Sequence, residues 1–269
     1  MMRSIAFGDE RPLIMAHRGD PVAAPENSLL SMRKAVEIGV DFLETDVRMT
    51  RDNHLVLFHD ETLLRTTGRE SKVKELTLDE MKEIDLGETF SPDGKKFPFR
   101  GKDIGIVTLK DAFDAFPDIP FNLDIKDKDP VAPEMLASII REYGRQENVI
   151  VASFHDKQLV RFRNSMPEVA TSACPGEITR FVFALKMRVL RLFNRGCKYE
   201  AFQVPLKYGM ISVVDDRFLQ AAHERDVAVH VWTINGREKM EELIDLGVDG
   251  IFTDEPALLK SVLSERGML

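Results

Sequence analysis

Short runs of apolar residues recur along this chain, and stretches with helical spacing of apolar positions separate most of them. The runs are mostly four to seven residues long and rich in Val, Ile and Phe. That pattern is typical of strands buried on both faces of a parallel sheet. We therefore predict strands over residues 13–17, 41–47, 55–59, 121–125, 149–154, 169–173, 201–204, 227–233 and 250–253.

Helices are predicted after most of these strands. In the first of them Leu29, Met32 and Val36 fall on one face, and Gly39 stands where a helix end favours a left-handed residue. The alternation of strand and helix predicts a parallel sheet covered by helices. The predicted helices span residues 28–38, 130–143, 157–164, 179–193, 216–225, 237–246 and 256–263.

Nine strands are one more than a (β/α)8 TIM barrel requires. Only a turn-like stretch with Arg51, Asp52 and Asn53 separates strands 41–47 and 55–59, which is too short for a crossover helix. The second strand is therefore predicted to pair antiparallel with the first, and eight barrel strands remain. An open doubly wound sheet is the competing architecture, but the chain has no Gly-rich phosphate loop of the dinucleotide-binding type.

Residues 61–107 interrupt this alternation, because they contain no convincing strand–helix unit. They carry charge runs, a short helix-like stretch over 78–84, and a segment rich in Pro, Gly and Lys over 91–101. A stretch of this length is far longer than an ordinary loop. We predict an insertion after the early strands, standing over one end of the barrel, within a single domain that spans residues 1–269.

The amino-acid composition and net charge exclude several classes of protein. The chain has 43% hydrophobic and 30% charged residues, with 37 Lys plus Arg against 45 Asp plus Glu and a net charge of −8. This acidic balance argues against a nucleic-acid-binding protein. Two cysteines, Cys174 and Cys197, exclude a disulfide-dense scaffold and a cysteine zinc site. We see neither a signal peptide nor an apolar run of the ~20 residues that a membrane span needs, and we expect a cytoplasmic protein.

Polar side chains gather where the early strands end. Glu44 and Asp46 are two residues apart and therefore point to the same face of their strand, as do Asp124 and Lys126. If the strands are parallel and adjacent, these groups meet at the carboxyl end of the barrel, where barrel enzymes hold their active sites. The strand-end residues are His17, Arg18, Glu44, Asp46, His59, Asp60, Asp124 and Lys126.

This combination of residue types points to phosphate chemistry. Converging carboxylates repel one another, and a hard divalent cation such as Mg²⁺ or Ca²⁺ is the simplest compensation for an all-oxygen ligand set. Two histidines can act as acid and base near neutral pH. Arg and Lys add fixed positive charge that suits phosphoryl transfer.

Each residue also has an ordinary structural interpretation. A single His at a strand end is usually a hydrogen-bonding group, a Glu-x-Asp pair is often a solvated strand edge, and Asp124 with Lys126 can form a surface salt bridge of little energy. Their joint occurrence at the ends of consecutive strands favours the functional interpretation.

Longer motifs contain these residues. The first group is His17-Arg18-Gly19, Pro25-Glu26-Asn27-Ser28, Glu44-Thr45-Asp46-Val47 and His59-Asp60 with Arg65-Thr66-Thr67-Gly68. The second group is Asn122-Leu123-Asp124-Ile125-Lys126, Val231-Trp232-Thr233-Ile234-Asn235 and residues 247–256. In this order the motifs resemble the glycerophosphodiester phosphodiesterase family over nearly the whole chain. A barrel with an insertion after the early strands is also what that family shows.

The resemblance implies that Glu44, Asp46 and Asp124 bind one divalent cation, Mg²⁺ or Ca²⁺. The family usually has Glu where this chain has Asp124, and the shorter side chain leaves direct ligation or a water-bridged contact open at that position. Glu26 and Asn27 are expected to hold the loop and the start of the following helix.

The resemblance also implies that His17 and His59 are the general acid and base, and that Arg18 and Lys126 bind the phosphate. The implied function is metal-dependent hydrolysis of small glycerophosphodiesters to sn-glycerol 3-phosphate and an alcohol. A cyclic phosphate formed by the glycerol 2-hydroxyl is the implied intermediate, and direct attack by water would use the same residues. Two alternatives are hydrolysis of lysophospholipids by a lysophospholipase D reaction and a non-catalytic barrel that binds phosphate esters.

Two aromatic residues at strand ends are candidates for binding the glycerol or the alcohol. These are Trp232, the single Trp of the chain, and Phe154, for which core packing is an equally good interpretation. Gln203 is a weaker candidate for a polar contact.

Residues 179–199 contain no acidic residue. On a helix Arg180, Arg188, Arg191 and Arg195 would fall within an arc of about 80°, opposite an apolar face. A barrel helix with a solvated basic stripe is the simpler interpretation. The alternative is peripheral contact with an anionic membrane surface.

Overall fold

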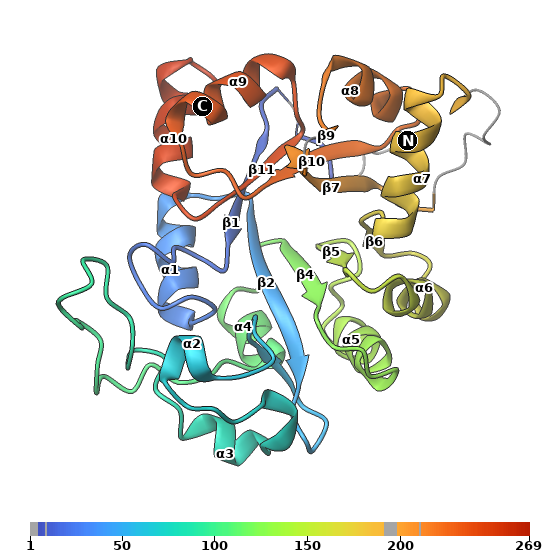
Figure 1. Ribbon diagram of the computed structural model, residues 1–269. Coiled ribbons are helices and arrows are strands. Elements are labelled where there is room, and N and C mark those ends of the chain that lie inside the picture. The colour runs from blue at the N-terminus through green and yellow to red at the C-terminus, as the bar shows by residue number, and fades with distance from the viewer. Residues whose placement is uncertain (1–4, 9, 191–197, 210) are drawn as a thin grey trace.

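The computed structural model describes residues 5–8, 10–190, 198–209 and 211–269 (Figure 1). Eight parallel strands form the barrel, and hydrogen bonds connect them in the order β6-β5-β4-β2-β1-β11-β10-β7. A parallel bridge between Ser172 and Ala201 joins the two ends of this series and closes the barrel. The strands are β1 (Leu13–His17), β2 (Phe42–Met49), β4 (Phe121–Ile125), β5 (Val149–Ala152), β6 (Ala170–Thr171), β7 (Ala201–Pro205), β10 (Ala228–Trp232) and β11 (Gly250–Thr253).

The barrel prediction is confirmed, and so is the antiparallel role of the ninth strand. That strand is β3 (Leu55–Leu57), which pairs with β2 through Val47 and Leu57. The open doubly wound sheet is excluded because the bridge between Ser172 and Ala201 closes the series of strands.

Helices surround the barrel (Figure 1). Helix α1 begins after Ser28, whose hydroxyl accepts a hydrogen bond from the backbone of Ser31, and it ends at Gly39 with φ of 87°. The surrounding helices are α1 (Leu29–Ile38), α4 (Leu109–Ala115), α5 (Val131–Glu142), α6 (Asp156–Ser165), α7 (Pro175–Lys186), α8 (Asp216–His223), α9 (Arg237–Leu246) and α10 (Pro256–Glu265).

Helix α4 was absent from the prediction, and so was the hairpin of β8 (Lys207–Tyr208) and β9 (Ile211–Ser212). Helix α4 is only seven residues long, so the periodic signal is weak. Its N-terminal signal is nevertheless present, because the Thr108 hydroxyl accepts from the Asp111 backbone and the Asp111 carboxylate accepts from the Thr108 backbone.

The predicted bounds of helix 179–193 are wrong. Helix α7 begins at Pro175 and ends at Lys186. The backbone N–H of Cys174, the residue before the helix, donates to the Glu177 carboxylate. Arg188 follows the helix with φ of 58°, so it cannot belong to a continuous helical stripe. Arg191 and Arg195 lie outside the described residues. The predicted arc of four arginines on one helix is therefore wrong for Arg188.

The interior of the barrel changes character along its axis. Apolar side chains that include Met15, Phe42, Ile150 and Phe252 form a buried cluster. Phe42 is the first residue of its strand, whereas the charged Glu44 and Asp46 come later on the same strand. The apolar residues therefore form a floor toward the amino ends of the strands, and the carboxyl ends hold the polar groups.

The insertion is built from short elements, namely α2 (Leu64–Thr67), a 3₁₀ helix η1 (Val73–Glu75) and α3 (Leu78–Lys82). Leu63, Val73, Met81 and Ile106 contribute to a small buried cluster that also includes side chains from β3 and the residue after it. The segment lies near the carboxyl end of β2 (Figure 1). Its own core holds it against the rim of the barrel.

Within the described ranges, no helix combines the length and the apolar character that crossing a membrane would require. Cys174 is buried with a free thiol, and Cys197 lies outside those ranges.

Candidate active site

The register of three parallel strands brings the predicted carboxylates together. Cα partners across the sheet are His17 with Glu44, Glu44 with Asn122, and Asp46 with Asp124. Partners in register on neighbouring strands share one face, which here is the barrel interior. The carboxyl residues Glu44, Asp46 and Asp124 are only 5%, 1% and 6% exposed. All three line one pocket at the carboxyl end of the barrel.

The turn after β1 directs Arg18 into this pocket. Arg18 has φ of 60° and Gly19 has φ of 89°. A Cβ atom at position 19 would lie 2.5 Å from the Ser31 hydroxyl oxygen, so this turn requires glycine. The Arg18 backbone N–H donates to the Glu44 carbonyl at 2.9 Å and to its carboxylate at 3.1 Å.

Two cations bracket the carboxylate of Asp46. Arg18 Nε lies 3.1 Å from Oδ2, and Lys126 Nζ lies 2.9 Å from Oδ1. Burial favours the protonated form, but Lys126 and Arg18 outweigh it and lower the pKa of Asp46. Lys126 Nζ is also 2.6 Å from Asp124 Oδ2, yet burial still raises the pKa of Asp124. Lys126 therefore bridges two carboxylates.

Glu44 has less compensation than Asp46. Burial and the neighbouring Asp46 charge raise the pKa of Glu44 to about 7. Its nearest imidazole nitrogen is Nε2 of His17, at 4.0 Å. The site therefore carries more negative charge than Arg18 and Lys126 neutralise.

His17 is held from behind by Asp254. The imidazole Nδ1 lies 2.6 Å from Asp254 Oδ1, and the Asn235 amide donates to the other oxygen at 2.7 Å. Asp254 follows β11, which lies beside β1 in the closed barrel. Burial lowers the pKa of His17, but Glu44 and Asp254 outweigh burial and raise it above 6.5.

His59 has a parallel arrangement at the end of the hairpin strand. Its Nδ1 lies 2.6 Å from Asp60 Oδ1, and Arg65 Nε donates to Asp60 Oδ2 at 2.6 Å. Burial lowers the pKa of His59 below 6.5, although Asp46 acts in the opposite direction. The imidazole side chain is 35% exposed, so it faces the pocket from its rim.

Arg65 of the insertion connects the two sides of the site. Its guanidinium donates to both oxygens of the Glu26 carboxylate at 2.7 Å. Glu26 in turn accepts from Arg18 Nη1 at 3.0 Å. One side chain of the insertion thus positions the carboxylates behind both His59 and Arg18.

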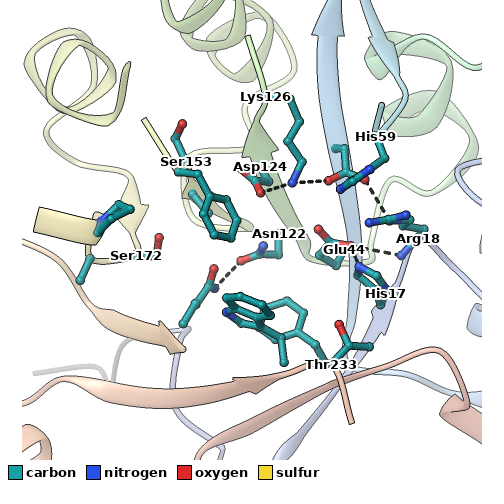
Figure 2. A pocket seen from close by; sticks show the side chains of 18 of the residues that line it. His17, Arg18, Glu44, His59, Asn122, Asp124, Lys126, Ser153, Ser172 and Thr233 are labelled. Carbon is teal, nitrogen blue, oxygen red and sulfur yellow. Dashed lines mark hydrogen bonds and ion pairs between the residues drawn. The ribbon is translucent and has the colours of Figure 1, made fainter. Parts of the chain in front are cut away.

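The pocket has a volume of about 210 Å³. Figure 2 shows His17, Arg18 and His59 on one side, with Ser153 and Ser172 opposite. Phe154 and Trp232 pack edge to face, with ring centroids 5.6 Å apart, and both line the pocket. Gln203, the weaker candidate for a polar contact, also lines the pocket. Its amide donates to Asn122 Oδ1 at 2.6 Å.

The site offers the oxygen ligands that a divalent cation prefers, and in this structure Lys126 holds two of the three carboxylates in ion pairs. Three buried carboxylates supply oxygen atoms, and Asp124 Oδ1 is buried without a hydrogen-bond partner. The raised pKa of Glu44 also marks a place where added positive charge would be favourable. Among the described residues, no three His, Cys, Asp or Glu side chains form a metal-binding cluster, and the Lys126 ammonium lies between Asp46 and Asp124.

The structure brings every predicted site residue into this one pocket. These residues are His17, Arg18, Glu44, Asp46, His59, Asp124, Lys126, Phe154 and Trp232. Phe154 lies two residues beyond β5 rather than at the end of a strand, and it is 56% exposed, which argues against core packing.

Sequence analysis missed the residues behind the site. Glu26 was expected to hold a loop and in fact pairs with Arg18, while Asp254 and Arg65 were quoted in motifs without a role. For Asp254 a signal was available, because the last strand of a closed barrel must neighbour the first. Asp254, the residue directly after the last strand, is therefore expected beside the end of the first strand, where His17 lies.

The chain is similar to known proteins over most of its length. A model of the Glycerophosphoryl diester phosphodiesterase family matches residues 17–258. A glycerophosphodiester phosphodiesterase from Caldanaerobacter subterraneus is 33% identical over 263 residues, covering 96% of this chain and all of that protein. A lysophospholipase D from Mus musculus is 25% identical over 93% of this chain and 85% of that protein.

Among solved structures, a phosphodiesterase from Oleispira antarctica in complex with the product sn-glycerol-3-phosphate has the same fold. Its TM-score is 0.74 at 24% identity, and the match covers 94% of this chain and 97% of that one.

The two histidines should titrate on opposite sides of 6.5 in the protein without added divalent cations. NMR titration of the imidazole carbons should give a pKa above 6.5 for His17 and below 6.5 for His59. Asp254→Asn should lower the pKa of His17 and leave that of His59 in place. Equal pKa values for the two imidazoles would contradict the assignment.

The two histidines also change the free energy of unfolding in opposite directions as the pH changes. His17 contributes stability that is present below its unfolded pKa and is lost as the pH rises through its higher folded pKa. His59, with a lowered pKa, destabilises the fold as the pH falls through 6.5 toward its folded value.

Proposed function

We propose, from the premise that this chain belongs to the glycerophosphoryl diester phosphodiesterase family, that it hydrolyses glycerophosphodiesters to sn-glycerol 3-phosphate and an alcohol. The observation that carries this proposal is a pair of imidazoles beside buried carboxylates, with each Nδ1 held by an Asp. Binding alone would not require an acid–base pair. We further propose that one barrel domain, residues 1–269, holds all of the machinery.

Arg18 and Lys126 would bind the phosphate of the diester. Both side chains line the pocket, and both are already held by carboxylates within the fold. Their charges are therefore fixed in place before substrate arrives, so little reorganisation is needed when negative charge develops on the phosphoryl oxygens.

Glu44, Asp46 and Asp124 would hold one divalent cation, Mg²⁺ or Ca²⁺. A bound cation would supply positive charge that stabilises the phosphoryl group during the reaction. Asp124 is one methylene shorter than Glu, and its orphaned Oδ1 supports direct ligation or ligation through one water. A cation beside Glu44 would offset the burial and the Asp46 charge that raise its pKa.

The reaction would proceed in two displacements. One imidazole accepts the proton of the glycerol 2-hydroxyl while the hydroxyl oxygen attacks phosphorus. The other imidazole donates a proton to the departing alkoxide. The P–O bond to the alcohol breaks, and a cyclic phosphate remains. Water then opens the ring with the two imidazoles in reversed roles, which returns both to their starting states. Direct attack by water would use the same groups.

The environments of the two imidazoles support an assignment of the acid and the base. The raised pKa of His17 favours its protonated form, so His17 would act as the general acid in the first displacement. The lowered pKa of His59 favours its neutral form, so His59 would act as the general base. Phe154 and Trp232 would pack against the glycerol or the alcohol.

Hydrolysis of lysophospholipids is a second candidate. The murine relative is named a lysophospholipase D, and the segment of this chain that begins with α7 carries apolar side chains at the pocket and at the surface. Ile178 of α7 lines the pocket, while Phe183 and Met187, later in the same segment, are 64% and 59% exposed. Contact between residues 179–199 and an anionic membrane belongs to this candidate.

Release of sn-glycerol 3-phosphate from glycerophosphocholine should be detectable in an enzyme-coupled assay, and chelation should abolish it. Restoring Mg²⁺ or Ca²⁺ should restore turnover, because the carboxylates would otherwise repel the diester. Lysophosphatidylcholine in the same assay separates the two candidate functions. Activity that resists complete chelation would contradict the proposed cation.

His17→Ala and His59→Ala should each lower turnover by about 10²- to 10⁴-fold with cation binding retained. A diester with a p-nitrophenol leaving group needs little protonation of that group. It should therefore restore much of the activity of His17→Ala but not of His59→Ala. The opposite pattern would exchange the roles of acid and base, and near-normal turnover of either variant would remove that residue from the mechanism.

Arg65→Gln should lower activity by about 10- to 100-fold, because Asp60 and Glu26 would lose the group that orients them. Both kcat and KM should change, since one carboxylate supports His59 and the other supports Arg18. Arg100→Gln is the matched control, because Arg100 also belongs to the insertion but pairs with Glu88. Equal kinetics for the two variants would contradict the positioning role.

A further inference from the structure

A groove leaves the catalytic pocket beside Lys126 and Phe154. Lys126 lines both the pocket and a neighbouring cavity of about 720 Å³, and Phe154 lines both the pocket and a second cavity of about 450 Å³. Those two cavities share Lys128 and His155 as common walls. The shared residues place the three spaces side by side along a path from the reacting groups to the rim between β4, β5 and the hairpin of β2 and β3. We call this path the cationic groove.

The carboxylates along the cationic groove are already occupied by partners within the fold. Asp127 accepts from the Met49 backbone at 2.5 Å and pairs with Arg48 at 3.3 Å. Asp129 accepts from the Val131 backbone at 2.9 Å, where it caps the start of α5. Asp127 is therefore ion-paired, and Asp129 is hydrogen-bonded to the backbone.

The two remaining acids of the cationic groove are also engaged. Glu61 pairs with Lys72 at 2.9 Å, and Asp156 accepts from the Gly176 backbone at 3.4 Å. Within the described residues, none of the four carboxylates forms an ion pair with a lysine that lines the groove.

Those lysines are Lys128 and Lys157. Both are exposed, and the structure gives neither side chain an ion pair or hydrogen bond to any of the residues it describes. Lys74 adds a further positive charge along the same path, whereas Arg48 and Arg51, which also line it, pair with Asp127 and Glu80. This concentration of cations stands out on a chain whose net charge is −8.

We propose that the cationic groove binds a phosphate group on the alcohol part of the substrate, so that the preferred substrates are glycerophosphodiesters whose alcohol carries a phosphomonoester. This inference rests on the proposed function. The glycerol moiety is common to every substrate of the class, whereas the alcohol varies and must extend out of a small pocket. A path that begins at the phosphate-binding Lys126 offers that exit.

Distance and charge agree with this occupant. Lys128 follows Lys126 by two residues, so their Cα atoms are at most about 7 Å apart. An alcohol with a phosphate a few bonds from the ester oxygen can therefore contact both lysines. A phosphomonoester near neutral pH carries close to two negative charges and several acceptor oxygens, which suits clustered lysines. A neutral alcohol gains nothing from these charges, and a quaternary ammonium is repelled by them.

Glycerophosphoinositol and glycerophosphoinositol 4-phosphate test the inference, with released sn-glycerol 3-phosphate as the measurement. The wild-type enzyme should have a kcat/KM about tenfold higher for the 4-phosphate at low ionic strength. The preference should shrink as salt is added, because exposed charges are screened. The double variant Lys128→Gln/Lys157→Gln should bring the ratio near one while turnover of glycerophosphoinositol stays at the wild-type value.

The matched control is Lys95→Gln/Lys102→Gln, which removes two exposed lysines from the loop of the insertion, away from the groove. It should keep the wild-type preference, which separates a local subsite from a change in net charge. Two outcomes would overturn the proposed role of the groove alone. One is an equal kcat/KM for both diesters in the wild type, and the other is a preference that persists in the double variant. No release from either diester would overturn the proposed function and the groove with it.

Discussion

The burial of three carboxylates inside one end of a parallel barrel is the constraint on which the rest of the structure depends. At a separation of about 4 Å, two like charges repel by about 4 kcal/mol at the effective dielectric of a protein surface, and burial adds a desolvation cost. Arg18 and Lys126 offset part of this cost at Asp46, but Glu44 keeps a pKa near 7. The remaining imbalance makes the site a place where a cation and an anionic substrate can bind together.

The same constraint explains why the site has a second layer of charged residues. Three groups that face the pocket are each held by a carboxylate behind them: His17 by Asp254, His59 by Asp60, and Arg18 by Glu26. Arg65 then joins two of these partners from the insertion. The insertion is therefore more than a long loop, because its own small core supports an arginine that orders the rim of the barrel.

The pocket offers two chemically different surfaces beyond the reacting groups. Phe154 and Trp232 form an aromatic wall, and Lys126 begins a path lined by further lysines. Lys126 Nζ lies 5.1 Å from the centre of the Phe154 ring, so the two surfaces meet at one point. The chemistry of the alcohol can be selected there without any change in the groups that act on phosphorus.

The sequence alone determined the barrel, the antiparallel hairpin strand, and the residues that face the pocket. Buried strands are visible in the sequence as short apolar runs. Glu44 and Asp46 are two residues apart on one strand, so the sequence alone places both side chains on the same face. It could not determine the true bounds of α7 or the short helix α4, where capping outweighs a weak periodic signal. The pairings of Asp254, Glu26 and Arg65 join segments remote in sequence, and only closure of the barrel and docking of the insertion decide which charges meet. Periodicity is a local property, whereas compensation of buried charge depends on three-dimensional distance.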